Sequence, residues 1–195
     1  MLFLASKSPR RKELLKQLGC SFELISAEID ETPLLNESPI NFVKRMAHEK
    51  AQAGWQQLAQ RKASENWVLG SDTIVVINEV ILGKPKSFEH FCEMLASLSG
   101  QTHQVMTSVA LVSGNKKLTD TVITNVTFKE LSQQDILAYW QTNEPQDKAG
   151  GYGIQGIAGK FVTHIEGSYF SVVGLPLYET ELLLAQAQQI NRVGE

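Results

Sequence analysis

The segment LFLASKSPRRKELLKQLG, residues 2–19, joins an apolar run to a helix-start signal. Its first four residues predict a short buried strand. Ser8 predicts an N-cap, and Pro9 occupies the first helical position, where the missing N–H of proline is tolerated. Gly19 is well placed to end the helix. A strand followed by a helix is the unit from which α/β folds are built.

The rest of the chain continues this alternation. Helices are expected from Ser38-Pro39 to about residue 60, from Ser87 to near Gly100, from Ser132, and after Pro176. Strands are expected at residues 22–25, 68–69, 74–77, 80–82, 105–112, 118–128, 161–165 and 169–173, with turns at Asn78-Glu79 and Ser113-Gly114-Asn115. Residues 143–160 are rich in glycine and show little periodicity. The pattern predicts an α/β fold with a mixed sheet.

Composition excludes several classes of protein. The 195-residue chain has a formal net charge of -3, whereas a general nucleic-acid binder usually has a basic excess. Cys20 and Cys92 form no C-x-x-C pattern, which disfavours a disulfide framework or a zinc site and favours a reducing compartment. Basic residues follow the apolar start too soon for a signal peptide, and no apolar run approaches membrane-spanning length. We therefore expect a cytoplasmic protein.

The junction at residues 5–11 is a candidate anion site. Helix N-termini present unpaired N–H groups and the positive end of the helix dipole. Arg10 and Arg11 oppose that dipole, so their position favours a compensating anion. A capped surface helix with solvated basic residues explains the pattern equally well.

Four further segments contain candidate functional groups, each with a simpler structural explanation. Asp72, in Gly70-Ser71-Asp72-Thr73, could hold a divalent cation or orient a water at a strand end, or could bond local backbone in a turn. Lys84, in Gly83-Lys84-Pro85, could bind phosphate oxygens or be solvated, and Lys50 presents the same choice. Gln155, in the glycine-rich residues 147–156, could pair with a base edge or lie in a flexible loop.

Taken together, these segments resemble the Maf family of nucleoside triphosphate pyrophosphatases, and the branch acting on dTTP and UTP is the most similar. The resemblance rests on L-A-S-K-S-P-R-R at 4–11, A-x-x-K-A at 47–51, G-S-D-T at 70–73, G-K-P at 83–85, S-G-Q-T-H at 99–103 and K-A-G-G-Y-G-I-Q-G at 148–156. It implies a single domain over residues 1–195, of the Maf/ITPase-like kind. That fold is an elongated, two-lobed α/β body with a central mixed β-sheet flanked by helices and an active-site cleft between the lobes. It also implies a homodimer.

The same resemblance implies cleavage of the substrate between its α- and β-phosphates, giving a nucleoside monophosphate and pyrophosphate. Asp72 matches the proton acceptor of the family, and the positions that set substrate choice are matched by Arg10, Thr73 and Gln155. The polar lining of the cleft is matched by Glu31 and by the expected phosphate-binding residues Ser6, Arg11, Lys50 and Lys84. Because hard cations prefer carboxylate oxygens, we expect Glu31 and Asp72 to hold Mg²⁺ or Mn²⁺. Whether Asp72 acts as base, metal ligand or both stays open. Lys7 and Gly151 depart from the family pattern without altering these groups.

Two other functions are considered. The main alternative is a nucleotide-binding regulator of septum formation with little turnover, because the family is also associated with that process. An RNA-binding module using Arg10 and Arg11 is disfavoured by the overall acidity and by the lack of a basic-aromatic stripe. We expect a nucleoside triphosphate as substrate, and neither a nucleic acid nor a membrane as partner.

Overall fold

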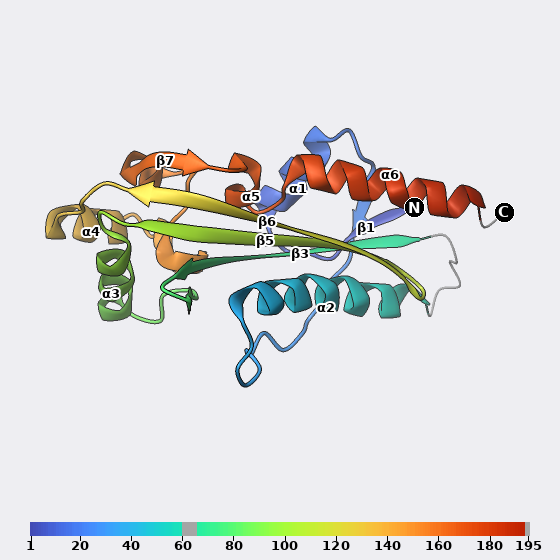
Figure 1. Cartoon of the computed structure of the whole chain (residues 1–195), viewed down its shortest axis with the longest axis horizontal. Coiled ribbons are helices and arrows are strands. Elements are labelled where there is room, and N and C mark those ends of the chain that lie inside the picture. The colour runs from blue at the N-terminus through green and yellow to red at the C-terminus, as the bar shows by residue number, and fades with distance from the viewer. Residues whose placement is uncertain (60–65, 194–195) are drawn as a thin grey trace.

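The computed structural model describes residues 1–59 and 66–193, which form an elongated body around one β-sheet (Figure 1). Within these residues the sheet has seven strands, ordered β2-β1-β3-β5-β6-β7, with β4 beside β3. The strands are β1 (Leu2–Leu4), β2 (Phe22–Leu24), β3 (Trp67–Ile77), β4 (Val80–Leu82), β5 (Thr102–Ser113), β6 (Lys116–Phe128) and β7 (Val162–Glu166). β1 is parallel to β2 and β3, and the other pairs are antiparallel. The predicted α/β fold with a mixed sheet is confirmed.

Helices flank the sheet, with α2 along one face and α6 along the other (Figure 1). They are α1 (Pro9–Gln17), α2 (Pro39–Ala59), α3 (Phe88–Leu98), α4 (Gln133–Trp140), α5 (Tyr169–Val173) and α6 (Leu177–Val193), with 3₁₀ turns η1 (Glu144–Asp147), η2 (Ala149–Gly151) and η3 (Ile157–Phe161). The predicted caps Ser8, Ser87 and Ser132 each accept a hydrogen bond from the backbone N–H three residues later. The predicted end of α2, near residue 60, lies at the edge of the described residues.

The side chains of β3 alternate between the two faces of the sheet, as the pleat requires. Trp67 and Leu69 pack in the cluster formed with α1 and α6, whereas Ile74 and Val76 pack against α2. Asp72 belongs to the α2 face by this alternation, and Thr73 belongs to the opposite face.

The contact between α2 and β3 is unusually close at Gly70. A Cβ atom at Gly70 would lie 2.5 Å from the backbone nitrogen of Ala51 and would also meet the carbonyl oxygen of Ala47. Ala47 and Ala51 are both fully buried. Small residues on both elements therefore set how closely the helix approaches the strand.

Two large hydrophobic clusters divide the body, and β3, β5 and β6 contribute to both. One cluster contains Val75, Val105 and Phe128 and packs with α3 and α4. The other contains Leu69 and Leu111 and packs with α1 and α6. These clusters are the cores of the two expected lobes, and the same three strands pass through both.

Two local expectations were wrong. Residues 70–73 are the interior of one continuous strand, not a turn or a strand end, because β5 pairs with β3 from Val68 to Val76. Residues 169–173 form the short helix α5 and not a strand. There the Ser168 side chain accepts a hydrogen bond from the N–H of Ser171, and Gly174 follows with a positive φ of 127°, so the apolar run is capped at both ends.

Candidate active site

A gap in the sheet creates the candidate site. β1 pairs with β3 only as far as Leu69, and β4 joins the same edge of β3 from Val75 onward. Between these points, residues 70–74 have no strand partner on that edge within the described part of the chain. The segment after β1 and the segment after β4 flank the gap. This topology explains why motifs far apart in the sequence lie near Asp72.

The gap opens into a cleft of about 1630 Å³. Its lining includes every residue that the sequence singled out, namely Ser6, Arg10, Arg11, Glu31, Lys50, Asp72, Thr73, Lys84 and Gln155. Six different segments of the chain supply them. The structure therefore brings the predicted residues together around one cleft.

Lys50, on α2, joins two carboxylates at the centre of the cleft. Its Nζ atom lies 2.7 Å from Asp72 Oδ1 and 2.7 Å from Glu31 Oε1. The side chains of Lys50 and Asp72 are each only 13% exposed, whereas that of Glu31 is 59% exposed. Burial raises the pKa of Glu31, but the hydrogen bond and charge of Lys50, together with the charges of Lys84 and Arg11, leave that pKa below its usual value. The Lys50 ammonium group thus links the Glu31 carboxylate, on the loop before α2, to the Asp72 carboxylate on β3.

On the opposite face of β3, Arg11 is bound to the protein itself. Its Nε donates to the carbonyl oxygen of Gly174 at 2.8 Å, and its Nη2 donates to Thr73 Oγ1 at 3.0 Å. Burial lowers the pKa of Arg11, and the carboxylate of Asp72 opposes that effect. These bonds fix the guanidinium beside the unpaired edge of β3.

Thr73 is held from the sheet side by a residue that the sequence did not reveal. Thr107 is fully buried on β5. Its Oγ1 atom lies 3.0 Å from Thr73 Oγ1 and 2.7 Å from the carbonyl oxygen of Ser171. A hydroxyl has one proton, and a carbonyl oxygen only accepts. The shorter bond to Ser171 therefore takes the Thr107 proton and fixes the Thr107 rotamer. The sequence signal that could have pointed to Thr107 is its place as a polar residue within the mostly apolar run 105–112.

The beginning of α1 lies at the cleft as the sequence predicts. Ser8 Oγ accepts a hydrogen bond from the N–H of Arg11 at 3.4 Å, and Ser6 Oγ accepts from the N–H of Ser8 at 3.2 Å. Within residues 1–59 and 66–193, neither Arg10 nor Lys84 forms an ion pair. These two cations and the helix N-terminus can therefore receive an anionic ligand without breaking an internal ion pair.

The glycine-rich segment is ordered by Glu144, which the sequence reasoning missed. The Glu144 carboxylate accepts hydrogen bonds from Tyr139 Oη at 2.9 Å and from the N–H of Ile157 at 3.0 Å. Burial, together with this carboxylate, raises the pKa of Tyr139. A Cβ atom at Gly156 would collide with the same carboxylate, so the absence of a side chain there is required. Gln155 lies within this braced turn.

The carboxylates at the gap fit a divalent cation. Because Glu31 Oε1 and Asp72 Oδ1 lie equally close to Lys50 Nζ, the two oxygens are separated by at most twice 2.7 Å. Mg²⁺ is usually bound by one or two carboxylates together with phosphate oxygens of the substrate. Within the described residues, no group of three or more His, Cys, Asp or Glu side chains is placed to hold a metal by itself. The donor set therefore suits a cation that arrives with a phosphorylated ligand.

Fold and cleft together define an α/β protein with a site for a polyanionic ligand. None of the helices in the described part of the chain is long and apolar enough to cross a membrane. The chain belongs to the Maf-like protein family, whose model matches residues 1–187. This result confirms the resemblance seen in the six motifs.

Curated relatives match over nearly the whole chain. A Pseudoalteromonas atlantica protein named dTTP/UTP pyrophosphatase is 57% identical over 187 residues, which cover 95% of this chain and 96% of that protein. A Pseudoalteromonas translucida protein of the same name is 57% identical over 183 residues, covering 94% and 95% of the two chains. Among solved structures, the Ham1 protein of Staphylococcus aureus has a TM-score of 0.43 and 13% identity over 65% of this chain and 71% of that one, a similarity too low to carry an argument.

Proposed function

We propose that this protein hydrolyses dTTP and UTP to the nucleoside monophosphate and pyrophosphate. The observation that carries the proposal is the placement of Asp72 in the gap of the sheet, 2.7 Å from Lys50 and beside the N-terminus of α1. Relatives that are 57% identical and bear the name dTTP/UTP pyrophosphatase support the choice of substrate. Hydrolysis of a triphosphate depends mainly on positioning and on charge stabilisation, which this cleft can provide.

In the proposed reaction, Asp72 accepts a proton from the attacking water. Lys50 binds Oδ1 of Asp72, whereas Oδ2 makes no hydrogen bond within the described residues, so Oδ2 is the oxygen that takes the proton. The oxygen of the water bonds to the α-phosphorus, and the bond from that phosphorus to the bridging α–β oxygen breaks. The bridging oxygen and the bond electrons leave with pyrophosphate.

Cations around the cleft would bind the phosphates. Ser6 and the N-terminus of α1 offer hydrogen bonds, and Arg11, Lys50 and Lys84 offer positive charge to the phosphate oxygens. A Mg²⁺ or Mn²⁺ ion bound by Glu31 and Asp72 would neutralise further negative charge on the phosphates. Lys50 would then exchange part of its carboxylate contact for a phosphate contact.

The nucleobase would be selected by Arg10, Thr73 and Gln155, which all line the cleft. An amide side chain can accept from the ring N–H and donate to a carbonyl oxygen of uracil or thymine. A base with a different edge would leave buried polar groups unpaired, and such mismatches are discriminated strongly. The bracing of the Gln155 turn by Glu144 supports this role, since a fixed amide discriminates better than a mobile one.

A panel of nucleoside triphosphates and modified analogues, assayed with Mg²⁺ or Mn²⁺, tests the proposal. We expect sustained release of pyrophosphate and monophosphate, with dTTP and UTP preferred. Release of orthophosphate without pyrophosphate would contradict the proposed reaction. A stoichiometric burst followed by no turnover would instead support the nucleotide-binding regulator. The single domain, the homodimer and the cytoplasmic location expected from the sequence remain predictions.

A further inference from the structure

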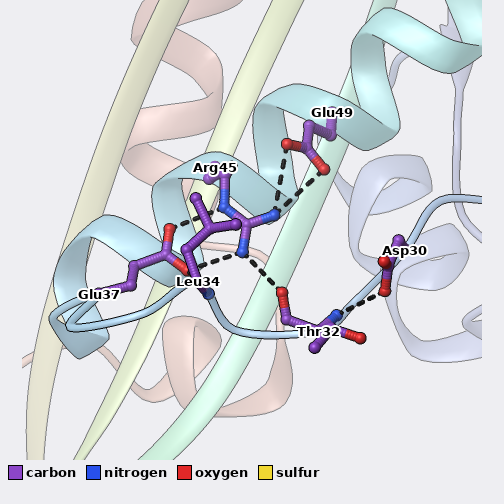
Figure 2. A network of polar contacts seen from close by, with 6 residues as sticks. All are labelled: Asp30, Thr32, Leu34, Glu37, Arg45 and Glu49. Carbon is purple, nitrogen blue, oxygen red and sulfur yellow. Dashed lines mark hydrogen bonds and ion pairs between the residues drawn. The ribbon is translucent and has the colours of Figure 1, made fainter.

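The loop between β2 and α2 carries Glu31 and is held in place by a network of residues that do not themselves line the cleft (Figure 2). The N–H of Thr32 donates to Asp30 Oδ1 at 2.9 Å, which forms a tight turn around Glu31. Farther along, the N–H of Leu34 donates to Glu37 Oε2 at 3.0 Å. The loop is therefore folded on both sides of its midpoint by its own carboxylates.

Arg45, on α2, binds this loop at two points. Its Nε and Nη2 atoms each donate to one oxygen of Glu37 at 2.7 Å, and Nη2 also donates to the carbonyl oxygen of Thr32 at 3.0 Å (Figure 2). The Glu37 side chain is only 8% exposed and that of Arg45 20%. The hydrogen bonds from Arg45 lower the pKa of Glu37 to about 2. A bidentate, largely buried ion pair of this kind fixes the relative orientation of the two side chains in addition to pairing their charges.

These contacts of Arg45 with the loop bear on Glu31, which precedes Thr32 in the chain. Lys50 lies on the same helix as Arg45 and binds the Glu31 side chain, while Arg45 binds the main chain one residue later. The Glu31 side chain is 59% exposed, and an exposed ion pair alone does little to order a loop. The hydrogen bond from Arg45 to the Thr32 carbonyl oxygen therefore holds the loop main chain in place, which the Lys50–Glu31 ion pair alone does not do.

We propose that Arg45 is a positioning residue that acts through the loop on Glu31, setting the carboxylate at the place where it serves the reaction. This inference rests on the proposed function. Arg45 itself does not line the cleft, so it has no direct contact with substrate. Its partner Glu37 has the same role from the loop side.

A double-mutant cycle tests the proposal. The variants are Arg45→Met, Glu31→Gln and the two combined, assayed for kcat/KM of pyrophosphate release from UTP and for the metal concentration that gives half-maximal activity. We expect Arg45→Met to lower kcat/KM on the order of 10- to 100-fold, as misplacement of a reacting group does. Combined with Glu31→Gln, it should cause no further loss, because the group that it positions is already absent. Arg45→Lys should restore part of the loss, since its ammonium group keeps the positive charge and N–H donors but cannot reach both Glu37 and Thr32 as the guanidinium does.

Glu49→Gln is the matched control. Glu49 contacts Arg45 at 3.4 Å from within α2 and makes no contact with the loop in the network of Figure 2, so this variant should retain wild-type kcat/KM.

If Arg45→Met does not fold, Glu37→Gln breaks the same pair from the loop side and enters the cycle in its place. Losses that multiply in the double variant, or an unchanged Arg45→Met enzyme, would overturn the role of Arg45. A wild-type protein that releases no pyrophosphate would overturn the proposed function instead. In that case amide exchange at residues 31–36, expected to quicken in Arg45→Met, still tests the anchoring of the loop.

Discussion

Replacing Gly70 with alanine should damage the site without changing any group in it. The new Cβ atom would stand 2.5 Å from the backbone nitrogen of Ala51 and 3.0 Å from its Cβ. To reach the 3.4 Å at which ordinary contacts begin, α2 must withdraw from β3 by about 1 Å. Lys50 lies on the helix that withdraws, and Asp72 lies on the strand that does not.

The expected effects follow from this displacement. Overpacking of a buried contact costs about 1–3 kcal/mol of stability, and at this chain length each kcal/mol lowers Tm by about 2–4 °C. The 2.7 Å contact between Lys50 and Asp72 would lengthen. A misplacement of about 1 Å costs on the order of 100-fold in rate. We therefore expect a large fall in kcat/KM beside a modest fall in Tm.

Pyrophosphate release and thermal unfolding should be measured together, with Ala53→Gly as the control. Ala53 is on the same helix and half-buried, and glycine in a helix interior costs about 1 kcal/mol without pushing on the sheet. Gly70→Ala with wild-type kcat/KM would refute the reasoning. So would an equal loss of activity in Ala53→Gly, because general weakening of α2 would then explain both results.

Three other outcomes are expected. Asp72→Asn should bind nucleotide but lose most turnover, and near-full turnover would remove Asp72 from the role of base. Gln155→Ala should change the preference among triphosphates more than the maximal rate for UTP, whereas equal losses across all triphosphates would indicate a structural role. Burial lowers the pKa of His103 to about 4, so this side chain stays neutral in the folded protein where the unfolded chain, with an ordinary pKa near 6.5, is already protonated. Stability should therefore fall as pH drops from about 6.5 to 4, by about 3 kcal/mol from this residue. His103→Gln should show a smaller fall in urea unfolding between these pH values, and an unchanged fall would assign the acid sensitivity to other groups.

Local signals in the sequence were sufficient for most element boundaries. Ser8, Ser87 and Ser132 cap helices because a side-chain oxygen reaches the N–H three residues later, which is a short-range property. The turn at Asn78 and Glu79 is equally local, since both residues have positive φ angles. The pattern of residues 169–173 predicts a strand although they form a helix, because alternation and a one-turn helix are hard to distinguish over five residues.

The residues that support the site could not be found in the same way. The local sequence around Asp72 predicts a turn or a strand end, because the pairing that places Asp72 inside a strand comes from β5, more than 30 residues away. Glu144 and Arg45 act through main-chain groups of other segments, and a main-chain group has no sequence signature. The sequence motifs were sufficient to identify the groups that line the cleft. The groups that hold those residues in place can be identified only once the fold is known.

The continuity of β3, β5 and β6 limits how the protein can move. Proteins whose halves are joined by flexible linkers close around a ligand by rotation about a hinge. Here such a rotation would bend three hydrogen-bonded strands at once, because each strand belongs to both hydrophobic clusters. A ligand therefore enters and leaves the cleft without such a rotation, and the groups on β3 keep their positions relative to one another.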